Sequence, residues 1–172
     1  MIRDCESHIQ SKGHPDVVYG ERVKYIGPYW YHKKCRRHDQ VALGMFVELS
    51  CMLISRKLFA TIAFDPSYME AGDYAFVCQL MRAYPQAQWH RYARVLTFVV
   101  LDKMHEGHLA QKLREDWRVQ QTLLRQGALA RVAVLSTRLI SQLLRKLTRL
   151  ALGYPGYNTG LVPLDKEGRV TL

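Results

Sequence analysis

The chain has 172 residues, 48% of them hydrophobic, and its formal net charge is +10. This length corresponds to one domain with a real core. The sequence has no run of about twenty apolar residues, and its start, MIRDCESHIQ, has no apolar signal-peptide core, so neither a membrane-spanning helix nor secretion is expected. The cysteines, Cys5, Cys35, Cys51 and Cys78, are spread singly, which favours reduced thiols in a cytosol over a zinc site.

The positive charge lies largely in the C-terminal third of the chain. Between Trp117 and Leu164 there is no Asp or Glu. The basic residues of this stretch are Arg118, Arg125, Arg131, Arg138, Arg145, Lys146 and Arg149. An excess of this kind is typical of proteins that bind nucleic acid, an anionic membrane or phosphorylated substrates.

The first forty residues predict a short polar helix over 2–12, a short strand at 17–19 that ends at Gly20, and a basic, aromatic loop over 22–40. In that loop the aromatic residues 29–31 stand beside the basic residues of 33–37 and could stack on bases and grip phosphates. The alternative is a surface loop that packs its aromatic side chains on the sheet. We favour the surface loop because no RNA-binding motif accompanies it, and we expect no nucleic-acid partner.

The middle of the chain predicts a buried strand over 41–58 and then a helix that begins near Asp73. Its apolar residues recur at helical spacing at Phe76, Val77, Leu80 and Met81. A carboxylate at a helix start has two interpretations. It can cap the helix by accepting from free backbone N–H groups. It can also be aimed into a cleft as a general base, and the two roles are compatible.

Beyond residue 85 the pattern predicts a strand over 89–101, the loop His105-Glu106-Gly107-His108, and a helix from Leu109 to about residue 126. Two histidines three residues apart can share a metal when they lie on one helical face. The sequence H-E-G-H does not match H-E-x-x-H, and no third ligand is evident nearby. Surface loop histidines are the common alternative.

A second long helix is predicted over 127–153, followed by a loosely ordered tail over 154–172. Its apolar stripe consists of Val132, Leu135, Leu139, Leu143, Leu147 and Leu150. Arg131, Arg138 and Arg145 recur every seven residues, which keeps them close together on the helix surface. Such a helix, through residues 131–150, could bind an anionic membrane surface. Equally, it could pack its stripe on the domain with the arginines facing water.

The segment FDPSYMEAGDYAFVCQL resembles the part of family 2 glycosyltransferases that follows their nucleotide-sugar-binding half. Three more stretches resemble the family in the same order. PDVVYGERV is similar to the strand after the donor site, CMLISRKLF to the strand and turn before Phe-Asp, and LDKMHEGHLAQKLREDWRV to the loop and helix beyond. The resemblance covers roughly residues 15–119.

The resemblance implies roles for particular residues. Asp73 matches the catalytic base of the family. Tyr19, Glu21 and Arg56 fall in the matching stretches and are expected to bind substrate. His105 or His108 would take the place of a loop histidine that contacts the donor's metal or diphosphate.

The implied fold is α/β, the acceptor-side part of a GT-A-like domain (residues 1–126) with a mixed sheet and two C-terminal helices. The implied activity is transfer of a sugar from a nucleotide-sugar donor to a glycan or lipid-linked acceptor, as in polysaccharide biosynthesis. The expected location is cytoplasmic, or peripheral on the inner membrane face.

A complete family 2 enzyme also has a D-x-D-like motif that holds Mg²⁺ or Mn²⁺ and offsets the charge of the leaving diphosphate. Here Asp4-Cys5-Glu6 fits D-x-E in letters only, within a helical pattern. We therefore expect that roughly the first half of the catalytic domain is absent and that this chain alone binds no cation. The alternative function is a non-catalytic basic module that binds an anionic membrane or RNA.

Overall fold

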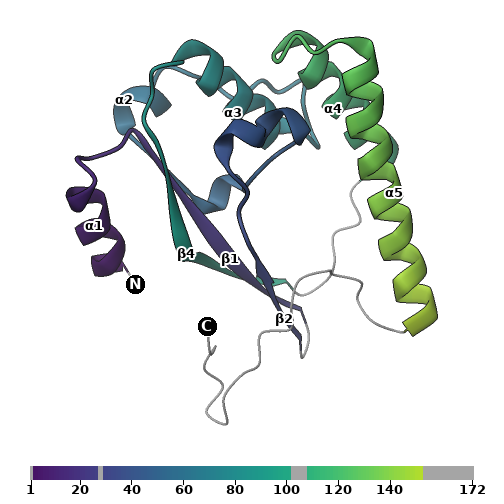
Figure 1. Cartoon of the computed structure of the whole chain (residues 1–172), viewed down its shortest axis with the longest axis horizontal. Coiled ribbons are helices and arrows are strands. Elements are labelled where there is room, and N and C mark those ends of the chain that lie inside the picture. Colours follow the sequence, from purple (N-terminus) through teal and green to yellow (C-terminus); the bar gives the residue numbers. More distant parts are fainter. Residues whose placement is uncertain (1, 27–28, 102–107, 153–172) are drawn as a thin grey trace.

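The computed structural model describes residues 2–26, 29–101 and 108–152, which form a mixed α/β fold (Figure 1). In chain order the longer elements are α1 (Ile2–Ser11), β1 (Val17–Ile26), β2 (Tyr29–Lys33), β3 (Met52–Ile54), α2 (Arg56–Phe59), α3 (Gly72–Ala83), β4 (Trp89–Leu101), α4 (Leu109–Thr122) and α5 (Ala128–Leu152). Two short 3-10 helices, η1 (His38–Leu43) and η2 (Leu49–Cys51), lie between β2 and β3. None of the described helices is long and apolar enough to cross a membrane.

The sheet has four strands and is built around β1. Strand β4 pairs with β1 in parallel along its whole length, from Val17↔Trp89 to Ile26↔Leu101. The other edge of β1 is shared by two antiparallel partners, β3 opposite residues 17–19 and β2 opposite residues 22–26. The mixed sheet is therefore short and open, with β1 at its centre.

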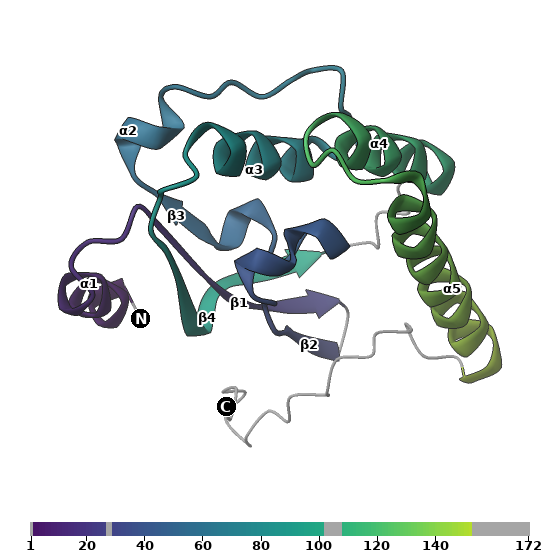
Figure 2. The ribbon, with the colours of Figure 1, turned by 45° about the horizontal axis from the view of Figure 1, so that its top comes forward.

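The two faces of the sheet are covered by different helices, because alternate residues of a strand point to opposite sides. Tyr19 faces the main core, in which it packs with Phe46, Tyr74 and Val77. Val18 faces the other side and packs with Cys5 of α1 and with Tyr92. Figure 2 shows α3 and α4 above the sheet and α1 beyond its edge.

Helix α3 lies at the centre of the main core, as its apolar spacing predicts. Phe76, Val77 and Leu80 are buried, and Met81 is half-buried against the same cluster. The prediction of a helix here is confirmed, as are the bounds of β4 and the long C-terminal helix, which is α5.

The predictions for residues 20–58 are partly wrong. The strand does not end at Gly20, because β1 continues to Ile26 and pairs with β2 inside the predicted loop. A Cβ at Gly20 would lie 2.6 Å from Leu96 and 2.9 Å from the Arg94 carbonyl oxygen, so this glycine allows close approach of β4 at a register shift. The predicted buried strand over 41–58 is instead the end of η1, a loop, η2, β3 and α2.

Candidate functional site

A cleft of about 850 Å³ lies between the start of α3 and one side of α5. Its floor and walls come from the turn before α3, from the loop after η1 and from α4. The charged residues that line it are Lys33, Arg36, Glu48, Glu70, Asp73, Lys112, Asp116 and Arg138. Asp73 lines this cleft, so it is here that a ligand could meet that carboxylate.

Asp73 is exposed in the first turn of α3, where Ala71 occupies the N-cap position. The helix start has no side-chain capping hydrogen bond, so the predicted capping bond from Asp73 is absent. Within the described part of the chain, the Asp73 carboxylate forms neither a hydrogen bond nor an ion pair. It remains within the favourable field of the helix N-terminus and is available to a ligand in the cleft.

The turn that presents Asp73 is held by a buried carboxylate from α4. Glu115 Oε2 accepts from the backbone N–H groups of Glu70 and Ala71, both at 2.8 Å, and Oε1 accepts from Met69 N–H at 3.2 Å. The side-chain amide of Gln111 also donates to Oε1, at 2.9 Å. Glu115 therefore fixes the three residues before α3 from the neighbouring helix.

The environment of Glu115 keeps it ionised. Burial raises its pKa, but hydrogen bonds from Gln111 and from the backbone of residues 69–71 outweigh burial and hold the pKa below its ordinary value. An ionised carboxylate accepts these N–H groups more strongly than a neutral acid does. The position of Asp73 thus depends on the charge of Glu115.

The opposite wall of the cleft is anchored by Arg138 of α5. Its guanidinium donates to the buried carboxylate of Asp116 and lies 5.3 Å from the centre of the Tyr74 ring. The Tyr74 hydroxyl in turn donates to the Val41 carbonyl oxygen at 2.9 Å. Gly44 has φ +115, and a Cβ there would overlap the Arg138 guanidinium, so only glycine fits this contact.

The surface that α5 presents to the cleft is apolar at Ala133 and Val134 and polar further along the helix. Thr137, Ser141 and Gln142 line it on this side. The hydroxyl of Thr137 donates to the Ala133 carbonyl oxygen at 2.8 Å, which leaves its oxygen able to accept from a ligand. Hydroxyl-rich ligands suit a wall of this kind.

The other residues predicted to bind substrate do not line this cleft. Tyr19 is 1% exposed, and its hydroxyl accepts from His38 N–H at 3.0 Å. Glu21 is buried and pairs with His32 at 2.6 Å and with Arg91 at 3.6 Å. Arg56 is exposed at the first position of α2.

The two loop histidines fall differently. His105 lies outside the described residues. His108 is exposed at the N-cap position of α4, and its backbone N–H donates to Glu70 Oε1 at 3.4 Å, one turn away from the Asp73 cleft. The described residues include no group of three or more His, Cys, Asp or Glu side chains that could hold a metal ion, so the structure offers no set of ligands for the divalent cation of a complete enzyme.

Sequence reasoning missed Gly44, Glu115 and Asp116, which shape the cleft, and it singled out Arg138 only as one of the regularly spaced arginines of the C-terminal helix. Glu115 and Asp116 were visible as adjacent acids within a helical pattern. Side chains at neighbouring positions on a helix point about 100° apart, so the two carboxylates must contact different partners. Which partners they serve depends on the tertiary fold. The aromatic side chains of Tyr29, Trp30 and Tyr31, singled out as base-stacking candidates, lie outside the described side chains.

Comparison of the chain with protein-family models and with curated proteins finds no match.

Proposed function

We propose that the protein is the acceptor-side part of a GT-A-like glycosyltransferase, in which Asp73 is the general base. The reaction is transfer of a sugar from a nucleotide-sugar donor to a glycan or lipid-linked acceptor. One observation carries the proposal. The Asp73 carboxylate lies on the wall of a cleft of about 850 Å³ and has no partner among the described residues.

The chemistry needs a carboxylate in such a position. The acceptor hydroxyl oxygen attacks the anomeric carbon as the bond from that carbon to the diphosphate oxygen breaks, and the configuration inverts. An Asp73 Oδ atom takes the hydroxyl proton, which requires hydrogen-bond reach to the acceptor oxygen. A carboxylate already committed to capping or to an ion pair would be a weaker base at this point.

The way in which Asp73 is held also supports the role of a base. The turn of residues 69–71 is fixed by Glu115, and Asp73 follows within the first turn of a buried helix. A rigid mount of this kind reduces the motion that would misplace a catalytic group. The polar side of α5 faces the same cleft and suits an acceptor rich in hydroxyl groups.

The described residues form no metal-ligand group, so we assign none of them a role in holding the cation of the donor. In a complete enzyme, Mg²⁺ or Mn²⁺ would belong to the nucleotide-binding half, together with its D-x-D motif. The chain supplies the base, the acceptor cleft and the helices that enclose it.

The test has two arms. In the first, nuclear magnetic resonance spectra of the chain alone are recorded with a panel of oligosaccharides, and we expect perturbations at Gly72, Asp73 and Thr137 with a binding acceptor. In the second, the chain is joined to the nucleotide-binding half of a family 2 enzyme and release of nucleoside diphosphate is measured. Perturbations confined to other surfaces, or turnover that survives Asp73→Asn, would contradict the proposal.

A further inference from the structure

Helix α5 turns apolar side chains toward solvent along most of its length. Leu129 is 88% exposed, Ile140 56%, Leu143 50% and Leu147 60%. Val132 and Leu139 are also exposed. We call these six residues the outer stripe of α5. At about 100° per residue, the positions 129, 132, 139, 140, 143 and 147 fall within about a third of the helix circumference, so they lie on one side of the helix.

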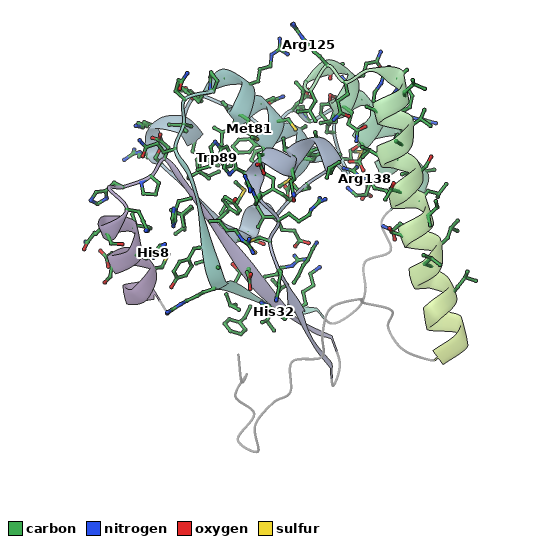
Figure 3. All side chains as sticks on the ribbon, viewed as in Figure 1. His8, His32, Met81, Trp89, Arg125 and Arg138 are labelled. Carbon is green, nitrogen blue, oxygen red and sulfur yellow. The ribbon has the colours of Figure 1, made fainter. Side chains whose placement is uncertain are left out.

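Arg131 and Arg138 of α5 lie on the opposite side, against the protein. Arg131 stacks over the Trp117 ring at 4.5 Å, and Arg138 pairs with buried Asp116. Figure 3 shows Arg138 on the side of α5 that faces the rest of the molecule. Of the two alternatives left open for this helix, the one with the apolar stripe on the domain and the arginines facing water does not hold for the described side chains, because most of the stripe is exposed and Arg131 and Arg138 face the protein.

The size of the outer stripe requires explanation. Helix α5 has 25 residues. At 1.5 Å per residue the helix is about 37 Å long. Single exposed leucines are ordinary on protein surfaces, but six exposed apolar side chains on one side of a long helix, interrupted there by Ser136, mark an interaction surface.

We propose that the outer stripe of α5 docks on an anionic lipid bilayer, with the helix lying flat in the headgroup region. Charge complementarity selects this occupant. The chain has a net charge of +10, α5 contains no acidic residue, and the C-terminal end of its sequence adds Arg145, Lys146 and Arg149 to the two arginines already engaged on the protein side. An anionic surface attracts such a helix, whereas a second copy would bring two basic helices together without a compensating acid.

The geometry also fits an interfacial helix better than other bilayer arrangements. No described helix is apolar enough to span a membrane, and α5 is held on its basic side by Asp116 and Trp117. A helix with one strongly apolar side and one polar side binds in the plane of the interface. Binding therefore depends on the leucines of the outer stripe, while Arg138 and Arg131 keep the helix on the domain.

The test is co-sedimentation of the full chain with phosphatidylcholine vesicles, with and without phosphatidylglycerol. The variant Leu143→Gln/Leu147→Gln removes apolar contact without changing charge. Its matched control is Leu53→Gln/Met69→Gln, which changes side chains that are 49% and 81% exposed but belong to β3 and to the turn before α3. Thermal melting of each variant checks that the fold is intact. If the double variant melts at a lower temperature than the parent, the single variant Ile140→Gln replaces it in the vesicle assay.

We expect the parent and the control to bind the phosphatidylglycerol vesicles, with binding reduced by salt and weak on phosphatidylcholine alone. The outer-stripe variant should bind at least about tenfold more weakly, because two leucine side chains no longer enter the apolar region. Equal binding of the stripe variant and the parent would overturn the proposal. Absence of vesicle binding would also overturn it if the protein instead self-associates through Leu143 and Leu147. The same holds if the protein binds no vesicles but binds RNA, and the Leu→Gln changes leave RNA binding intact.

Discussion

Two adjacent acids on α4, Glu115 and Asp116, are used for different purposes. Glu115 is 7% exposed and fixes the turn before α3 through backbone N–H groups. Asp116 is 2% exposed and pairs with Arg138 of α5, with Lys112 at 3.8 Å as a second cation. One helix thus sets both walls of the cleft, because consecutive side chains leave a helix in different directions.

Replacing Glu115 by Gln should destabilise the protein by about 1.5–3 kcal/mol at neutral pH, because hydrogen bonds to a charged acceptor are weakened. In the folded protein the pKa of Glu115 is lower than its value of 4.5 in the unfolded chain. The stability that Glu115 contributes is therefore fully present above pH 4.5 and is lost as the pH falls through the pKa of the folded state. The stability gap between parent and variant should therefore shrink on acidification. Urea unfolding across this pH range measures it.

The control for this measurement is Glu6→Gln, because Glu6 is exposed on α1. That change should alter stability little at any pH in the series. A gap between parent and Glu115→Gln that stays constant on acidification would mean that Glu115 stabilises the turn by shape alone.

At the scale of single elements, α5 is joined to the domain chiefly through Arg138. Replacing Arg138 by Ala leaves the buried carboxylate of Asp116 without its main partner, and we expect a loss of about 3 kcal/mol. Gly44→Ala should act in the same direction, because its Cβ would displace the guanidinium and its φ is +115. Hydrogen exchange should become faster along α5 in both variants.

The comparison for the Arg138 experiment is Arg131→Ala, which removes a cation–π contact with Trp117 worth about 0.5–1 kcal/mol. It should loosen α5 less than Arg138→Ala. If Arg138→Ala leaves exchange in α5 unchanged, the helix is held by other contacts.

Helix α1 is attached to the sheet through a pair of histidines. His8 lies on α1 (Figure 3), and its Nε2 is 2.7 Å from His90 Nε2, so one ring must be neutral to accept from the other. Burial, followed by His8 and Lys12, holds the pKa of His90 below 6.5. The stability that neutral His90 contributes is present above pH 6.5 and is lost as the pH falls through the pKa of His90 in the folded protein.

Acidification below pH 6.5, through the lowered pKa of His90, should therefore loosen α1 before the rest of the molecule. Hydrogen exchange, corrected for its intrinsic pH dependence, should rise in α1 relative to α4. In His90→Gln this additional rise should disappear. A uniform response of both helices to acid would show that the histidine pair does not control α1.

The elements that the sequence predicted best are those with strong local patterns. Helix α3 has apolar residues at helical spacing after Gly72, and β4 is rich in Val, Tyr and Phe. Strand β2 was not predicted, because its aromatic residues stand between Gly27-Pro28 and a run of basic residues, which together favour a loop, and its pairing with β1 is a tertiary contact. The prediction of a buried strand over 41–58 was wrong because Gly44, with φ +115, turns the chain between two 3-10 helices.

The candidate site was predictable only in part. Asp73 stood out from its place at a helix start, and the structure puts it on a cleft wall. The inward side of α5 could not be read from its pattern. Apolar stripes usually face the core, but here the buried charge of Asp116 draws Arg138 inward and so turns the leucines outward.

At the scale of the whole molecule, α5 separates the cleft from the surface proposed to meet the bilayer. Thr137 and Ser141 line the cleft, and Leu143 and Leu147 belong to the outer stripe. A helix is about 10–12 Å across. If both proposals hold, the base Asp73 works close to the headgroups, which favours a lipid-linked acceptor over a free glycan.

The lack of a metal-ligand group among the described residues leads to a prediction for the chain alone. We expect no tight binding of UDP or of UDP-sugars, with or without Mn²⁺, because the described residues form no metal-ligand group. Titration calorimetry measures this directly. Micromolar binding of UDP would mean that the residues assigned to the acceptor side form a donor site.

The central claim is that Asp73 takes the proton of the acceptor hydroxyl. In the chain joined to a nucleotide-binding half, Asp73→Asn keeps the shape of the side chain but cannot accept the proton, so turnover should fall by about a hundredfold or more. Melting should change little in both Asp73→Asn and Asp73→Ala, because Asp73 forms no capping bond and only a dipole interaction of about 0.3–1 kcal/mol is lost. Near-parental turnover in Asp73→Asn would remove Asp73 from the mechanism and contradict the assignment as a glycosyltransferase.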